Sequence, residues 1–220
     1  LRVQNKIKSG KYIAYFQAFT NTYAPMEVLR KKFTEAIEHP DIVMLSVATR
    51  PDCLPDDVID LLAQLNTIKP VSVELGLQTI HQKSADYIRR GYNLACFDDA
   101  VCRLKEAGLE VVCHIILGLP GESKSDMLQS VDYACRSGIN GIKLQLLHVL
   151  KNTDLEKEYR AGKFKTLTFE EYLDIIKSCV KIIPKEIVIH RLTGDGAKKD
   201  LIAPLWSADK KKVLNAISKL

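Results

Sequence analysis

The sequence lacks the signals of several protein classes. Its six cysteines form no C-x-x-C pair, it has no low-complexity stretch, and no apolar run approaches the roughly 20 residues that span a bilayer. We therefore expect no zinc or iron–sulfur ligand set within the chain and no membrane partner. Isolated cysteines within apolar patterns are typical of small buried side chains in a reducing cytosol, so we expect structural cysteines and a cytoplasmic location.

The composition is that of an ordinary globular domain. Hydrophobic residues make up 46% of the chain and charged residues 27%. The net charge of +5 is mild, so it is compatible with an anionic partner without requiring one. Basic residues gather near the end, and we interpret this group as a solvated helix face; its members are Lys198, Lys199, Lys210, Lys211 and Lys212.

Short β-rich runs alternate with amphipathic segments along the chain. The predicted strands are Tyr12–Ala18, Ile42–Ala48, Val71–Leu77, Glu110–Leu117, Gly141–Leu147 and Ile187–Leu192. The predicted helices are Met26–Glu38, Asp56–Ile68, Phe97–Ala107, Ser125–Ser137, Thr168–Ile182 and Asp209–Leu220. This alternation predicts an α/β fold of parallel strands joined by right-handed crossovers.

Six strands are too few for a closed eight-stranded barrel. An open or partial (β/α) barrel, or a doubly wound sheet, fits the strand number better. No domain boundary is visible before about residue 193. We therefore expect a core over residues 1–192 and a C-terminal loop and helix over residues 193–220.

Polar side chains interrupt strands that should be apolar on both faces. If the apolar positions lie under the helices, the inward-facing residues are Gln17, Ser46, Glu74, Gln78, His114, Lys143 and Gln145. Burying so many polar groups is unfavourable unless they are paired or wetted. The pattern predicts a polar, ligand-filled interior, and the alternative is an internal salt bridge between Glu74 and Lys143.

Several segments, in order along the chain, resemble one enzyme family. They are Tyr12–Thr20, Ala48–Cys53, Val73–Thr79, Arg90–Tyr92, His114–Glu122, Gly141–Leu144 with His148, and Ala203–Trp206. The set resembles the core of the radical S-adenosylmethionine (SAM) enzymes, in an Elongator-like branch that includes the YhcC-type proteins. The resemblance implies a partial (β/α)6 TIM-like barrel, here without its first strand, followed by a C-terminal strand and helix.

The resemblance also implies the cofactors. In this family a [4Fe–4S] cluster binds SAM, and one-electron reduction cleaves SAM to methionine and a 5′-deoxyadenosyl radical that takes hydrogen from a substrate. It implies that Gln78 binds the ribose, Arg90 the methionine carboxylate and Ile116 the adenine, while Arg50 is a candidate from its place on the rim. The expected cofactor-binding residues are Phe19, Thr20, Arg50, Gln78, Arg90, Ile116 and Leu147.

The other polar residues of the interior and rim receive less definite roles. Candidates for a catalytic role are Glu74, His114, Lys143 and His148. Structural interpretations stay open: Arg90 follows Arg89 where a basic residue complements a helix dipole, and His114 fits a satisfied core histidine.

Two features depart from the family pattern. Many relatives have a glutamate where this chain has Ala48. The cysteines that bind the cluster belong on a loop before Leu1, so we expect no metal ligand in this chain. We expect the chain to be part of a longer protein and to be inactive alone.

Two other functions remain alternatives. One is a barrel enzyme of the aldolase or phosphate-binding type, with Lys143 as a Schiff-base lysine and the Gly118–Ser123 loop holding phosphate. The other is a non-catalytic module that binds SAM or nucleic acid. For a radical SAM enzyme, the expected substrate is an RNA, with a transfer RNA base as first candidate. The other expected partner is an electron donor such as flavodoxin or ferredoxin.

Overall fold

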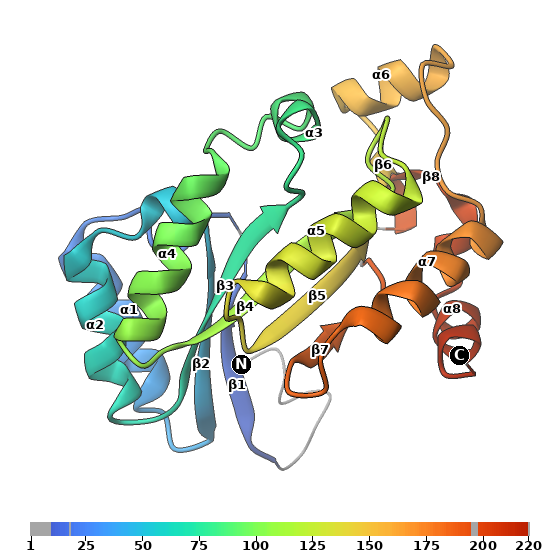
Figure 1. Ribbon diagram of the computed structural model, residues 1–220. Helices are drawn as coiled ribbons and strands as arrows, with labels where there is room; N and C mark the ends of the chain where they lie inside the picture. Colours follow the sequence, from blue (N-terminus) through green and yellow to red (C-terminus); the bar gives the residue numbers. More distant parts are fainter. Residues whose placement is uncertain (1–9, 18, 195–197, 220) are drawn as a thin grey trace. The chain divides into compact units, whose positions relative to one another are not determined.

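The computed structural model describes residues 10–17, 19–194 and 198–219. Ala18 and Leu220, at the ends of a predicted strand and a predicted helix, lie outside these residues. A six-stranded sheet has the order β1-β2-β3-β4-β5-β7, and β6 and β8 form a two-stranded sheet (Figure 1). The chain divides into two units, which are Leu1–Gly76 with Leu94–Val112, and Leu77–Asn93 with Cys113–Leu220.

The first unit contains the start of the sheet and the helices between its strands. Its elements are β1 (Tyr12–Phe16), α1 (Met26–Ile37), β2 (Ile42–Thr49), the 3₁₀ helix Pro51–Cys53, α2 (Asp56–Asn66), most of β3 (Val71–Gln78) and α4 (Leu94–Glu106). β1 pairs with β2, and β2 with β3, both in parallel. The parallel strands joined by helices confirm the predicted α/β class.

The register of these strands separates a polar face from an apolar face. Tyr15 lies beside Ser46, Ser46 beside Ser72, and Ala48 beside Glu74. Because side chains alternate along a strand, these residues share one face. On the other face, Leu45 and Val47 of β2 and Val73 and Leu75 of β3 are apolar and fully buried. On β1 the Phe16 ring packs edge-on against Phe33 of α1 with centroids 5.0 Å apart.

The second unit begins at the end of β3. Its elements are α3 (Gln82–Tyr87), most of β4 (Glu110–Leu117), α5 (Lys124–Arg136), β5 (Gly141–Leu146), β6 (Val149–Leu150), α6 (Asp154–Arg160), α7 (Phe169–Ile182), β7 (Val188–Arg191), β8 (Leu201–Ala203), the 3₁₀ helices Lys198–Asp200 and Leu205–Ala208, and α8 (Lys210–Ile217). β5 pairs with β7 in parallel, and β6 with β8 antiparallel.

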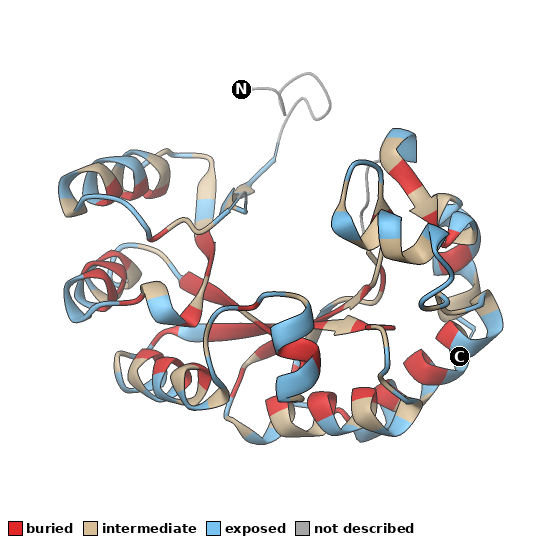
Figure 2. Ribbon diagram, turned by 90° about the horizontal axis from the view of Figure 1, so that it is seen from above, coloured by how far each residue is buried: buried red, intermediate tan, exposed pale blue. Residues whose placement is uncertain are grey.

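Reciprocal hydrogen bonds define where two helices of this unit begin. Ser123 and Asp126 form a capping box at α5, and Thr168 and Glu171 form one at α7. The apolar stripe of α7 then buries Tyr172, whose hydroxyl donates to the Leu192 carbonyl over 2.7 Å. Figure 2 shows buried residues along the strands and on one side of each long helix, as the periodicity predicts.

The twelve predicted elements are all present, with small differences at their ends. Helix α4 begins at Leu94, three residues earlier than the predicted Phe97. Helices α3 and α6 and strands β6 and β8 were not predicted, since they are too short to show a period. Within the described residues, no helix is both long and apolar enough to cross a bilayer.

Candidate functional site

Strand β3 ends in a strained turn at Gln78. The Thr79 amide donates to the Leu77 carbonyl over 2.8 Å, and Gln78 between them has a φ of 66°. A three-residue turn with positive φ is rare, and this conformation costs a side chain about 1–2 kcal/mol. The Gln78 Oε1 atom is buried and has no hydrogen-bond partner among the described residues. Strain and an unsatisfied polar atom at one residue are typical of a functional site.

The buried guanidinium of Arg90 holds the same turn. Arg90 is 6% exposed, and its Nη1 donates to the carbonyls of Leu77 (3.2 Å) and Thr79 (2.6 Å), the two residues that flank Gln78. Its Nε donates to the Tyr92 carbonyl over 3.0 Å, and its Cζ lies 5.0 Å from the centre of the Tyr92 ring. The remaining nitrogen, Nη2, is buried without a partner among the described residues. The structure therefore brings the predicted residues Gln78 and Arg90 together.

Glu122 is a second polar anchor of this strand end, and the sequence analysis did not single it out. The Thr79 hydroxyl donates to Glu122 Oε1 over 2.6 Å, and Glu122 Oε2 is buried without a partner among the described residues. Ser130 on α5 lies nearby, and its Oγ accepts a hydrogen bond from the Ile80 amide over 3.2 Å. In the sequence, the only pointer to Glu122 was the Gly-Leu-Pro-Gly-Glu loop over residues 118–122, of which Glu122 is the last residue.

Among the described residues, three buried atoms near the end of β3 lack a partner, and two of them, on Gln78 and Arg90, differ in chemistry. Gln78 Oε1 accepts hydrogen bonds, whereas Arg90 Nη2 donates them and carries charge. The acceptor suits a hydroxyl group and the donor suits a carboxylate, since a charge-assisted bond of this kind is strong. A ligand with a ribose and an amino-acid carboxylate offers both groups, so these residues fit SAM.

Strands β4 and β5 of the same unit carry the other predicted residues. His114 and Ile116, two positions apart on β4, are both half-buried, and His114 Nδ1 lies 3.0 Å from Gln145 Nε2. Lys143 is buried at 7% exposure and has interaction partners. His148 and Leu147 follow β5, and the Leu147 amide donates to the Leu117 carbonyl over 2.9 Å.

In the first unit, the buried carboxylate of Glu74 has two hydroxyl donors. Tyr15 Oη and Ser46 Oγ each donate to it over 2.8 Å. These bonds join three neighbouring strands on the polar face, as the inward positions of Ser46 and Glu74 predicted. Gln17, predicted to face the same way, is exposed just beyond the end of β1.

Ser46→Ala should destabilise the protein by about 2 kcal/mol, because it removes a hydrogen bond to a buried carboxylate. Urea unfolding followed by circular dichroism measures this loss. Ser125→Ala is the control, since Ser125 is exposed and its hydroxyl only accepts a bond from Gln129. An equal, small change in both variants would contradict the structural importance of the Glu74 cluster.

The loop after β1 is fixed by an asparagine that the sequence analysis did not mark. Asn21 Nδ2 donates to the carbonyls of Phe16 (3.0 Å) and Ala48 (2.8 Å). Phe19, with a φ of 62°, is 98% exposed, and Thr20 is half-buried. The Asn21 side chain therefore links the end of β1 to β2.

Arg50, a predicted cofactor-binding residue, already contacts a carboxylate of its own chain. Its Nε and Nη2 donate to the two oxygens of Asp52 over 2.8 and 2.6 Å. The Arg50 guanidinium holds the pKa of Asp52 below its ordinary value. An anionic ligand would have to share Arg50 with Asp52.

The cysteines do not form a metal site. All six are free thiols, and within the described residues no group of three or more Cys, His, Asp or Glu side chains could hold a metal ion. Burial raises the pKa of Cys113, that of Cys135 to about 11 and that of Cys179 to about 12, so these thiols are protonated at neutral pH. The described residues do not fit a [4Fe–4S] cluster, which needs thiolate ligands.

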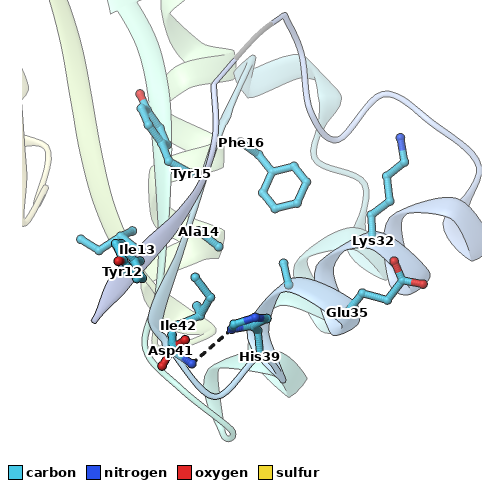
Figure 3. Close-up of a pocket in the computed structure, with 11 residues that line it drawn as sticks. Tyr12, Ile13, Ala14, Tyr15, Phe16, Lys32, Glu35, His39, Asp41 and Ile42 are labelled. Atoms are coloured by element: carbon cyan, nitrogen blue, oxygen red, sulfur yellow. Dashed lines mark hydrogen bonds between the residues drawn. The ribbon is translucent and has the colours of Figure 1, made fainter. Parts of the chain in front are cut away.

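An apolar groove lies between β1 and α1 (Figure 3). Its volume is about 690 Å³, and Ala14, Phe16 and Ile42 line it together with Lys32 and His39. Figure 3 shows Phe16 and Tyr15 on opposite sides of β1, with Phe16 on the side of Lys32 and Glu35. Among the described strands, only β2 pairs with β1, which leaves the other edge of β1 open.

Comparison with known proteins gives related chains of greater length. Our chain is 47% identical over 218 residues to the protein YtqA of Bacillus subtilis (strain 168), covering 99% of this chain and 68% of YtqA. It is 38% identical over 200 residues to YhcC of Escherichia coli (strain K12), covering 90% of this chain and 65% of YhcC. These similarities confirm the resemblance to YhcC-type proteins, and the chain spans about two thirds of their length.

A solved structure confirms the fold. The archaeal Elp3 of Methanocaldococcus infernus with an N-terminal deletion superposes with a TM-score of 0.81 at 20% identity, covering 99% of this chain and 57% of that one. The predicted Elongator-like partial-barrel fold is therefore correct. The radical SAM C-terminal domain model matches residues 139–220, and the model of the superfamily itself matches residues 2–134. Since that second match takes in more than half of the sequence, the chain belongs to the radical SAM superfamily.

Proposed function

We propose that this chain is the SAM-binding part of an enzyme that cleaves SAM reductively and acts on an RNA substrate. The observation that carries the proposal is that two buried atoms near the end of β3, Gln78 Oε1 and Arg90 Nη2, have no partner among the described residues. Membership of the superfamily, which uses SAM and a [4Fe–4S] cluster, supports the same ligand.

In this proposal, the residues of the chain bind and orient SAM. Gln78 accepts a ribose hydroxyl, and Arg90 donates to the methionine carboxylate from a guanidinium that three backbone carbonyls already fix. Because the Arg90 guanidinium is held before the ligand arrives, little of its side-chain entropy is lost on binding. Half-buried Ile116 and Leu147 offer apolar contacts for the adenine.

The remaining predicted residues have less support. Phe19 and Thr20 would offer backbone atoms to the methionine amino group, and Arg50 would assist only by sharing its contact with Asp52. Glu74, His114, Lys143 and His148 stay candidates for roles near the substrate. Lys143 is buried and engaged, which does not favour the alternative of a Schiff-base enzyme.

The cluster ligands belong, in this proposal, to a part of the longer protein that this chain does not span. A cluster held by that part of the protein would supply the electron that reductive cleavage of SAM needs, while the residues of this chain would bind and orient SAM. The edge of β1 that no described strand pairs with, together with the groove beside it, offers a place for another strand of that protein. Flavodoxin or ferredoxin is the proposed electron donor.

The proposal of an RNA substrate has support from a named relative. The chain is 29% identical over 168 residues to the tRNA uridine(34) acetyltransferase of Methanocaldococcus jannaschii, covering 75% of this chain and 30% of that protein. That relative acts on transfer RNA by its name, and we propose the same class of substrate here.

The test is anaerobic reconstitution of the longer protein with iron, sulfide and dithionite. Addition of SAM should yield 5′-deoxyadenosine and methionine, measured by liquid chromatography and mass spectrometry. Omission of dithionite is the control, since cleavage needs an electron. An intact, reduced cluster with SAM bound and no 5′-deoxyadenosine would refute the proposed reaction.

A further inference from the structure

Nearly all of the net charge of the chain lies in its last elements. Between residues 198 and 219 there are six lysines and two aspartates, which give +4 of the total of +5. The rest of the chain is therefore almost neutral. Such an asymmetry concentrates the attraction for a polyanion on one surface.

This charged segment surrounds two adjoining hollows with aromatic walls. One, of about 430 Å³, is lined by Phe169, Trp206, Lys198 and Lys212, and the other, of about 480 Å³, again has Phe169 and Lys212 in its wall. The rings of Phe169 and Trp206 lie 5.3 Å apart between centroids. We define the C-terminal basic surface by the residues Phe169, Lys198, Trp206, Lys211, Lys212 and Lys219.

The lysines of the C-terminal basic surface lack acidic partners. Within the described part of the chain, Lys198, Lys211, Lys212 and Lys219 have no carboxylate at ion-pair distance, and Lys212 Nζ lies 5.4 Å from the centre of the Phe169 ring. Elsewhere in the same unit lysines are paired, for example Lys124 with Asp174 over 2.5 Å. Among the described residues, no carboxylate therefore competes with a ligand for these four charges.

The position of these lysines on their helix is also unfavourable without a ligand. Lys210, Lys211 and Lys212 form the first turn of α8, where the helix dipole is positive, and no acidic residue lies in that turn. The carboxylate of Asp209, which lines both hollows, accepts the Lys212 amide over 3.0 Å as the helix cap. Repulsion in this turn would be relieved by a bound anion.

We propose that the C-terminal basic surface binds a single-stranded segment of RNA, with phosphates on the lysines and a base stacked on Phe169. Aromatic rings within a basic groove are the usual means of holding single strands. A concave surface suits a base better than a membrane, into which apolar side chains must protrude. Leu205 also lines the first hollow and is 70% exposed, and an exposed apolar side chain could enter a membrane. Lipid vesicles are therefore the second probe in the test.

This inference deepens the proposed function, since it names the surface that would hold an RNA substrate. Its test needs neither SAM nor the cluster, so the two proposals can fail separately. The sequence analysis saw the lysines only as a solvated face because Phe169 comes from α7, about 30 residues or more from most of them in sequence.

The test is binding of a fluorescein-labelled oligouridylate to the longer protein, followed by fluorescence anisotropy at several salt concentrations. The variant Lys198→Gln/Lys211→Gln/Lys212→Gln should reduce the magnitude of the slope of log K against log salt by about 2. Each of the three lost phosphate contacts contributes about 0.7 to that slope. Loss of these three phosphate contacts should also lower the affinity of the variant for RNA about 50-fold near 0.15 M salt.

Two further variants separate charge from stacking and from general effects. Phe169→Leu should weaken binding about tenfold with an unchanged salt slope, because it removes a ring and no charge. The charge-matched control Lys177→Gln/Lys181→Gln/Lys185→Gln, on exposed positions along and after α7, should bind as the parent does. Thermal unfolding checks that each variant is folded.

Either of two outcomes would overturn the inference. One is a folded triple variant at residues 198, 211 and 212 with the parent's affinity and salt slope for RNA. The other is loss of binding to phosphatidylglycerol vesicles in that variant while RNA binding is retained, which would assign the surface to a membrane.

Discussion

Arg90→Met should weaken SAM binding by the reconstituted longer protein about 30-fold, the equivalent of about 2 kcal/mol for a charge-assisted hydrogen bond. The same change removes the donors to three carbonyls, those of Leu77, Thr79 and Tyr92. Leaving such groups unsatisfied should lower the free energy of unfolding by about 3 kcal/mol or more. Anaerobic calorimetry measures the affinity, and urea unfolding measures the stability.

A second arginine separates the loss of affinity from the loss of stability. Arg103 also donates to a backbone carbonyl, that of Leu54 over 2.9 Å, and it pairs with Asp56 and Asp99. Arg103→Met should destabilise the fold while SAM affinity, measured well below the unfolding temperature, stays at the parent value. Equal losses of SAM affinity in both variants would show that Arg90 acts only on stability.

Gln78→Gly should have opposite effects on stability and on binding. Glycine adopts the φ of 66° without strain, and the change also removes a buried oxygen that has no partner among the described residues. We expect the free energy of unfolding to rise by about 1 kcal/mol, after allowance for the greater freedom of glycine in the unfolded chain. SAM affinity should fall about fivefold to tenfold with the lost ribose hydrogen bond. Chemical unfolding and calorimetry on the same preparation give both values.

Arg89→Gly is the matched control for this trade-off. Arg89 has a φ of 55°, so glycine should relieve similar strain there. Its ion pair with Asp154 is exposed and contributes little to stability. The control should therefore be more stable than the parent and bind SAM equally well. If Gln78→Gly also kept full SAM affinity, Gln78 would have no part in the site.

Much of the fold could be predicted because period and composition determine it locally. The stripe of Leu29, Phe33 and Ile37 specifies α1 without knowledge of the rest of the chain, and alternation in β3 specifies a strand with a polar face. The proximity of Gln78 and Arg90 came only from family resemblance. No local sequence pattern predicts that Arg90, which follows a short helix, donates to the carbonyls at the end of β3.

Other parts of the site could not be predicted from the residues. The positive φ of Gln78 is imposed by the contacts around it, since glutamine has no preference for that conformation. The Glu74 carboxylate, for which a salt bridge with Lys143 was one interpretation, has hydroxyl donors from Tyr15 and Ser46. Their approach depends on strand register, which a single sequence does not encode locally.

Among the described strands, none pairs with one edge of β1, and this has a consequence for handling the protein. Produced by itself, the chain would present backbone donors and acceptors next to exposed Ile13 and Tyr15, which are 55% and 38% accessible. The β1 strands of two copies could pair edge to edge through backbone hydrogen bonds, as strands do in amyloid-like stacks. Solubility of the isolated piece would then fall with concentration, and a lysine at position 13 would act as a gatekeeper against such self-assembly.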